Sequence, residues 1–281
     1  MIRRSRLGRQ LGDYVLKVLA WSAALVGVFF LLWILFVVIS HGAAAFSWSF
    51  FTELPAPPGV GGGGLANAML GTLYMTLLAS LAGVPVGMMV GVYLSEFALG
   101  SRFGNGVRFA INVLMGFPSI IMGLFAYSLL VVPMGHFSGY AGGLSLALLM
   151  LPVVARTAED MLLLVPNALR ESALALGAPR WRVTLGIVFR AAKGGLLTGI
   201  LLGVARVSGE TAPLLFTALN SPYWVDSLNQ PTANLTVTIF NYAMSPYPDW
   251  QQAAWGASFL IAISVLSLTI LTRVVARDHR R

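Results

Sequence analysis

Apolar residues dominate six separate stretches of this 281-residue chain, and polar residues gather between them. An α-helix needs roughly 20 residues to cross the hydrocarbon core of a bilayer, and most of the stretches are near that length. The predicted spanning helices cover about residues 18–40, 68–94, 109–132, 140–155, 194–219 and 253–272. Backbone groups in lipid must be hydrogen-bonded internally. The pattern therefore predicts an all-α integral membrane protein with six transmembrane helices.

Composition supports a membrane protein and excludes several functions. Hydrophobic residues make up 57% of the chain and charged residues 10%, whereas soluble domains average about 45–50% and about 25%. The net charge of +8 does not indicate nucleic acid, because the basic residues stand in short blocks beside the apolar stretches. The absence of cysteine excludes disulfides, iron–sulfur clusters and thiolate catalysis.

The basic residues also predict the topology. Of the 18 Lys and Arg residues, 17 lie in residues 1–17, in the turn near residue 102, in residues 156–193 and at the C-terminus. The remaining one is Arg206. By the positive-inside rule, both termini and the loop 156–193 are cytoplasmic, with residues 1–17 as a basic arm. The first apolar run is longer than the roughly 7–15 residues of a signal peptide, so we expect it to remain uncleaved.

The loop 156–193 is the longest polar excursion on the basic side of the membrane. Asn167 can cap a short helix, and Gly177 is a natural stop for it. Pro179 can then begin a second short helix over residues 180–190. Two short helices joined by a glycine turn suit a docking surface. On physical grounds alone, an ordinary amphipathic connector fits equally well.

The fifth apolar stretch carries a charged pair. Gly195, Gly199 and Gly203 lead at steps of four toward Arg206 and Glu210, so the five residues would share one stripe of a continuous helix. A glycine face lets another helix approach closely, which predicts that the pair points into a helix–helix seam. One interpretation is a structural ion pair. The other is a substrate path, because a guanidinium matches an oxyanion bidentately.

Two segments resemble a known family. Residues 171–177, Glu-Ser-Ala-Leu-Ala-Leu-Gly, resemble the EAA loop of ABC importer permeases, with Ser172 in place of the first alanine and Phe189-Arg190 in place of the usual Leu-Pro. Residues 205–215 resemble the Arg-x-x-Gly-Glu-Thr-Ala-Pro signature of phosphate-specific ABC permeases. Further similarity to the A-type subunit of that system extends from residue 66 onward, at residues 71–73, 85–87, 93–96 and 117–124.

The resemblance implies a type I ABC importer permease with a MetI-like fold in the bacterial inner membrane. Its partners would be a C-type permease subunit, two cytoplasmic ATPase subunits and a periplasmic phosphate-binding protein. Glu171, Ala173 and Gly177 would couple to the ATPase. Arg206, Glu210 and Thr211 would line the substrate path.

The chain itself has no phosphate-binding P-loop, since neither Lys17 nor Lys193 follows that spacing. We therefore expect a non-catalytic subunit with no cofactor or metal of its own, whose partner subunits bind ATP and Mg²⁺. Two alternatives remain open. One is a permease for another oxyanion, such as sulfate, molybdate or phosphonate. The other is a secondary transporter or channel that needs no ATPase.

The topology can be tested in the natural cysteine-free background. We expect an impermeant thiol reagent applied to intact cells to label Val60→Cys, in the predicted outer loop 42–66, and to leave Ala175→Cys unlabelled. Lysed cells serve as the control, because both positions should then react. Labelling of position 175 but not of position 60 in intact cells would reverse the topology.

Overall fold

The apolar stretches form long helices in the structure, a computed structural model that describes residues 6–278 and the side chains of residues 10 and 12–270. Residues 1–5 of the predicted basic arm and residues 279–281 lie outside this range. The long elements are α1 (Arg6–Gly42), α3 (Ala66–Val92), α4 (Arg102–Gly116), α7 (Gly139–Leu163), α10 (Phe189–Val207) and α13 (Pro248–Asp278). The short helices are α2 (Trp48–Thr52), α5 (Ser119–Ala126), α6 (Val132–Met134), α8 (Asn167–Ala175), α9 (Arg180–Val183), α11 (Ala212–Thr217) and α12 (Leu235–Ala243). Four 3₁₀ or π segments complete them, η1 (Ala43–Ala45), η2 (Tyr93–Phe97), η3 (Tyr127–Val131) and η4 (Thr184–Val188).

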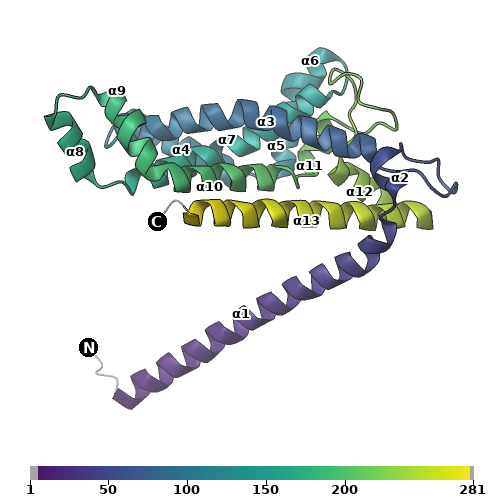
Figure 1. The fold of residues 1–281 in the computed structure, drawn as a ribbon, viewed down its shortest axis with the longest axis horizontal. Helices are drawn as coiled ribbons and strands as arrows, with labels where there is room; N and C mark the ends of the chain where they lie inside the picture. The colour runs from purple at the N-terminus through teal and green to yellow at the C-terminus, as the bar shows by residue number, and fades with distance from the viewer. Residues whose placement is uncertain (1–5, 279–281) are drawn as a thin grey trace.

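The predicted number of spans agrees with the structure. Within the described residues, five helices are long and apolar enough to cross a membrane, and a bent pair raises the number to six if it forms one span. The start of α1 and the end of α13 lie at the same end of the molecule as α8 and α9 (Figure 1). That end is the one for which the charge distribution predicts a cytoplasmic location.

The helix predicted over residues 109–132 is broken rather than merely kinked. The pair formed by Arg102–Gly116 and Ser119–Met134 bends by 104°. Phe117 is extended, at φ −72° and ψ 136°, because the ring of Pro118 disfavours the helical conformation in the residue before it. The chain therefore leaves α4 at this point and restarts as α5.

Other predicted helix bounds also differ from the structure. The first helix, predicted from residue 18, begins at Arg6 and includes residues 6–17 of the predicted basic arm. The helix predicted to end at residue 155 continues to Leu163, because Arg156 pairs along its own helix with Asp160 at 3.2 Å instead of ending it. The helix predicted over residues 194–219 stops at Val207 and resumes as α11 at Ala212. Pro213 stands in the first turn of α11, where the N–H that proline lacks has no helical partner in any case.

Helix α7 is the centre of the bundle. The positions of Gly83, Gly87 and Gly91 on α3 lie directly against its backbone and side chains, and a Cβ built on Gly91 would be 2.5 Å from the Cβ of Ala158. On α10, Gly195 and Gly199 lie against Met161 and Thr157 of α7. The predicted close approach at the glycine face is therefore confirmed for these two residues. Small residues let helix backbones come near enough for extensive packing in a membrane.

Helix α1 stands largely apart from this bundle. It contacts α13 near its C-terminal end, where the His41 and Trp255 rings lie 4.9 Å apart, and it diverges from the other helices toward its N-terminus (Figure 1). Gly42 permits the contact, because a Cβ there would clash with Trp255 and Phe259. The segment 220–251 before the long part of α13 contains the short helix α12. The Asn234 side chain caps α12 by accepting a hydrogen bond from the Val237 N–H at 2.8 Å.

The α3–α7 seam gives a testable expectation for stability. Gly91→Ala places a methyl group against Ala155, Ala158 and the backbone of Glu159, so we expect a loss of about 1–3 kcal/mol from overpacking. Gly27→Ala in α1 is the matched control, since no atom lies within 4 Å of its Cβ position. Thermal unfolding in detergent measures both, and equal midpoints would contradict the packing described for α7.

Candidate functional site

The charged pair of the fifth span lies at a break in that span. Arg206 is in the last turn of α10, and Glu210 is in the connection before α11. The Arg206 Nε and Glu210 Oε1 atoms are 3.8 Å apart. In this chain 56% of the Arg206 side chain is exposed, against 17% for Glu210. Such a long, exposed contact contributes little to stability, with a typical value of about 0–1 kcal/mol.

The predicted stripe is thus only partly correct. The glycines of α10 face α7, but Arg206 is exposed in this chain and does not enter the seam that they form. The prediction failed because it assumed one continuous helix through residue 219. The break after Val207 turns Glu210 off the helical stripe while leaving it near Arg206.

The break is held by a buried polar network. The Thr236 hydroxyl lies 2.8 Å from the Glu210 carbonyl oxygen and 2.9 Å from Asn234 Oδ1. The Leu235 N–H donates to the Thr72 hydroxyl of α3 at 2.9 Å. These bonds connect the broken segment to α12 and α3. They also supply a hydrogen-bond partner to the Glu210 carbonyl oxygen, which lies in the irregular segment between α10 and α11.

Thr211, the third predicted residue of the path, is the N-cap residue immediately before α11. It is partly buried, and its carbonyl oxygen accepts from the Leu214 and Leu215 N–H groups at 3.1 and 3.2 Å. Its side chain makes no capping bond to α11. The structure therefore brings Arg206, Glu210 and Thr211 to one break.

The residues predicted to couple to an ATPase separate into two groups. Glu171 is exposed on α8, and Gly177 is exposed after it with φ +80°. Ala173 is 6% exposed and packs with Val183 and Leu196 beneath α8. It therefore supports the short helix from below instead of standing on its outer face.

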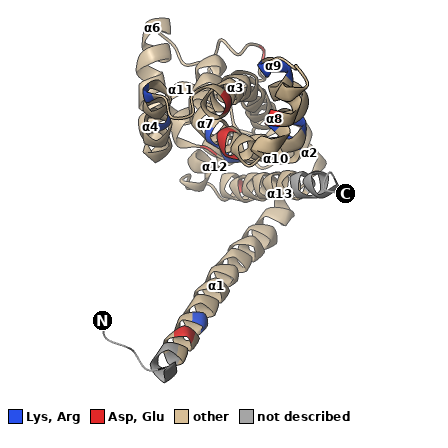
Figure 2. Cartoon of the chain, turned by 90° about the vertical axis from the view of Figure 1, so that its left-hand side faces the viewer, with Lys and Arg blue, Asp and Glu red and all other residues tan. Residues whose placement is uncertain are grey.

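The second short helix of this loop also differs from the prediction. Helix α9 ends at Val183, and η4 carries the chain directly into α10 without a turn. The polar end of the molecule therefore consists of α8, the Gly177 turn, α9 and the start of the fifth span. Figure 2 looks onto this end, where charged residues of α8, α9 and α7 gather.

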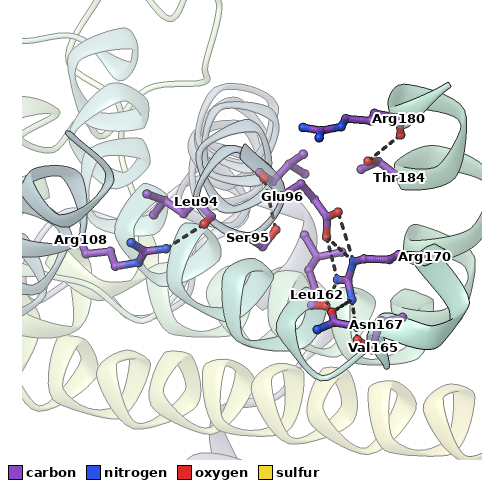
Figure 3. Close-up of polar contacts among 11 residues, drawn as sticks. Leu94, Ser95, Glu96, Arg108, Leu162, Val165, Asn167, Arg170, Arg180 and Thr184 are labelled. Atoms are coloured by element: carbon purple, nitrogen blue, oxygen red, sulfur yellow. Dashed lines mark hydrogen bonds and ion pairs between the residues drawn. The ribbon is translucent and has the colours of Figure 1, made fainter. Parts of the chain in front are cut away.

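Two ion-pair clusters lie beneath this end, and no periodic pattern along the chain predicts either of them. Glu96 of η2 pairs with Arg170 of α8 at 2.8 Å (Figure 3). Arg108 of α4 pairs with Glu159 of α7, which is 2% exposed, and also donates to the Leu94 carbonyl oxygen at 2.8 Å. The sequence predicts only a turn near residue 102 for this part of the chain.

Comparisons with known proteins identify the group to which this chain is similar. Residues 83–281 match the family described as binding-protein-dependent transport system inner membrane component. A relative from Yersinia pestis named "Phosphate transport system permease protein PstA" is 47% identical, covering 97% of this chain and 92% of the relative. One of the same name from Haemophilus influenzae is 49% identical, covering 91% and 90%.

Solved structures show the same fold. An inward-facing MetNI methionine ABC transporter chain matches with a TM-score of 0.63 at 22% identity, covering 77% of this chain and 96% of that one. A chain of a bacterial alginate ABC transporter, solved with a pentasaccharide-bound periplasmic protein, matches with a TM-score of 0.66 at 13% identity, covering 98% of both chains. The predicted MetI-like fold is therefore confirmed. The chain belongs to the family of inner-membrane components of binding-protein-dependent transport systems, and within it to the PstA permeases.

Proposed function

We propose that this chain is the permease subunit of an ATP-driven phosphate importer and forms the phosphate path together with a second permease subunit. The observation that carries the proposal is sequence identity: over almost the whole chain, nearly half of the residues are identical to those of phosphate transport permeases. The break that holds Arg206 and Glu210 contains the sequence Arg-Val-Ser-Gly-Glu-Thr-Ala-Pro. Another oxyanion, or a transporter without an ATPase, is the alternative.

The partners proposed for this permease follow from its class. A C-type permease would complete the path, a periplasmic phosphate-binding protein would deliver the anion, and two cytoplasmic ATPase subunits would bind ATP and Mg²⁺. The exposed outer face of α8 and the Gly177 turn form the ATPase contact in this proposal. Exposed apolar groups there support it, since Leu176 is 88% and Trp181 58% exposed. Co-purification of an ATPase with the tagged chain separates this proposal from a secondary transporter.

Arg206 is the proposed phosphate contact. Its exposure in the single chain leaves guanidinium donors free for an anion, and Glu210 is near enough to compete for the guanidinium when the anion departs. A planar guanidinium can donate two parallel hydrogen bonds to a phosphate group, which an ammonium cannot do. Thr211 adds a hydroxyl group at the same break.

The ATPase contact can be tested at Gly177. Gly177→Val forces a β-branched residue to φ +80°, at a cost of order 1 kcal/mol or more. We expect weaker co-purification of the ATPase at unchanged membrane abundance. Gly186→Val is the control, because that glycine has neither positive φ nor atoms within 4 Å of its Cβ position. Normal ATPase association and substrate-stimulated hydrolysis in Gly177→Val would contradict the assignment.

The phosphate path can be tested at the helix break. We expect Arg206→Gln to abolish uptake of labelled phosphate at normal membrane abundance, and Arg206→Lys to recover little of it. Glu210→Gln should impair uptake less, because only the competing carboxylate is lost. Arg190→Gln, at an exposed arginine of α10, is the control and should transport normally.

A purely structural ion pair predicts a different result. Under that reading, each single change lowers membrane abundance, and the exchanged pair Arg206→Glu with Glu210→Arg restores both abundance and uptake. Full uptake in the exchanged variant would therefore overturn the role of Arg206 as a phosphate contact.

A further inference from the structure

The guanidinium of Arg170 joins three parts of the cytoplasmic end of the bundle. Its Nη2 and Nε atoms donate to the Glu96 carboxylate of η2 at 2.8 and 3.2 Å. Nη2 also donates to the Leu162 carbonyl oxygen at 2.7 Å, and Nη1 to the Val165 carbonyl oxygen at 2.6 Å. Figure 3 shows Arg170 reaching from α8 into this cluster. One side chain therefore connects α8, the end of α7 and the segment after α3.

The cluster is well shielded from solvent. The Arg170 side chain is 16% exposed and that of Glu96 is 9% exposed. The two carbonyl oxygens belong to the last turn of α7 and the residues after it, where the regular helical bonding pattern ends. The Leu162 carbonyl oxygen also accepts from the Val165 N–H at 3.2 Å. Charge-assisted, multiply bonded arginine contacts of this kind hold a defined geometry better than a single exposed ion pair.

The backbone alone would hold α8 loosely. Pro166 precedes it in an extended conformation, at φ −58° and ψ 137°, and lacks an N–H to continue the α7 ladder. Gly177 follows it with φ +80°. The helix is thus flanked by two points at which its direction can change, and the Arg170 contacts cross the first of them. The Ala173 methyl group adds packing beneath the helix.

On the far side of the link, η2 is attached to the main frame of the bundle. It follows α3 directly, and α3 packs along α7 through Gly83, Gly87 and Gly91. Arg108 donates to the Leu94 carbonyl oxygen of η2 and pairs with Glu159 of α7. Any displacement imposed on Glu96 is therefore applied to α3 and α7 together.

We propose that Glu96 and Arg170 are positioning residues that transmit movement of α8 to α3 and α7. The inference rests on the proposed function, in which an ATPase contacts α8. The ion pair makes the link between α8 and η2, while the carbonyl contacts of Arg170 keep α8 folded against α7. Loss of the link should uncouple ATP hydrolysis from phosphate movement without detaching the ATPase.

The discriminating variant is Glu96→Gln, which removes the carboxylate charge and leaves both carbonyl contacts of Arg170 available. In the reconstituted complex we expect ATPase association and basal hydrolysis to be retained. The number of phosphate ions imported per ATP hydrolysed should fall roughly tenfold. A factor of this size lies within the range by which two coupled sites in a protein usually affect each other. Arg170→Lys should show the same fall, because one ammonium cannot serve the carboxylate and both carbonyl groups. Arg190→Gln is the control and should leave the ratio unchanged.

A second measurement needs neither phosphate nor ATPase. Amide hydrogen exchange in Asn167–Ala175 of the detergent-solubilised full chain should rise roughly tenfold in Glu96→Gln and stay unchanged in Arg190→Gln. Glu96→Cys with Arg170→Cys, joined by a short bis-maleimide in this cysteine-free chain, should restore the import ratio relative to the uncrosslinked form.

The outcomes separate the two hypotheses. If the wild-type complex hydrolyses ATP but imports no phosphate, the proposed function fails, and the exchange measurement still decides whether the link holds α8. If wild type imports phosphate while Glu96→Gln shows an unchanged import ratio and unchanged α8 exchange, the link is wrong. A fall in uptake that only follows a fall in complex abundance also overturns it, because that result indicates a folding role.

Discussion

Close packing on α7 is the interaction on which the rest of this molecule depends. Glycines of α3 and glycines of α10 pack against two adjoining rows of residues on α7. Met150 and Val154 of α7 contact glycines of both helices. Lipid tails are as apolar as leucine, so helices in a bilayer associate through such close contacts and not through a hydrophobic driving force. The frame made by α3, α7 and α10 then fixes where the broken fifth span ends.

The helix breaks satisfy a second constraint of the membrane environment. A backbone carbonyl without a helical partner must find another donor when water is absent. The Glu210 carbonyl finds the Thr236 hydroxyl, and α12, which carries that residue, is bonded in turn to Thr72 of α3. Side chains from distant segments thereby position the polar residues of the proposed path. Their hydrogen bonds allow a non-helical connection between α10 and α11.

The spans could be predicted from sequence because their signal is local. Length, apolarity and four-residue glycine spacing are properties of a single helix. In the structure, α3 and α10 are helices whose glycines at this spacing pack against α7. Pro213 is a local signal for the break before α11, but the contact that holds the break is not local, because Thr236 lies 26 residues from Glu210. Arg156 was misleading for a related reason, since a charge that pairs along its own helix does not end it. The Glu96–Arg170 pair joins residues 74 positions apart, and no periodicity in the sequence connects them.

That separation has a consequence for how the chain is made. A ribosome adds about 5–20 residues per second, so Arg170 is synthesised roughly 4–15 s after Glu96. During this interval the carboxylate at the end of α3 has no guanidinium, and hydration at the membrane surface must stabilise its charge. The Val165 carbonyl oxygen after α7 likewise receives its Arg170 donor only at that stage. This end of the bundle is therefore completed only after α8, which carries Arg170, has left the ribosome and folded back against α7.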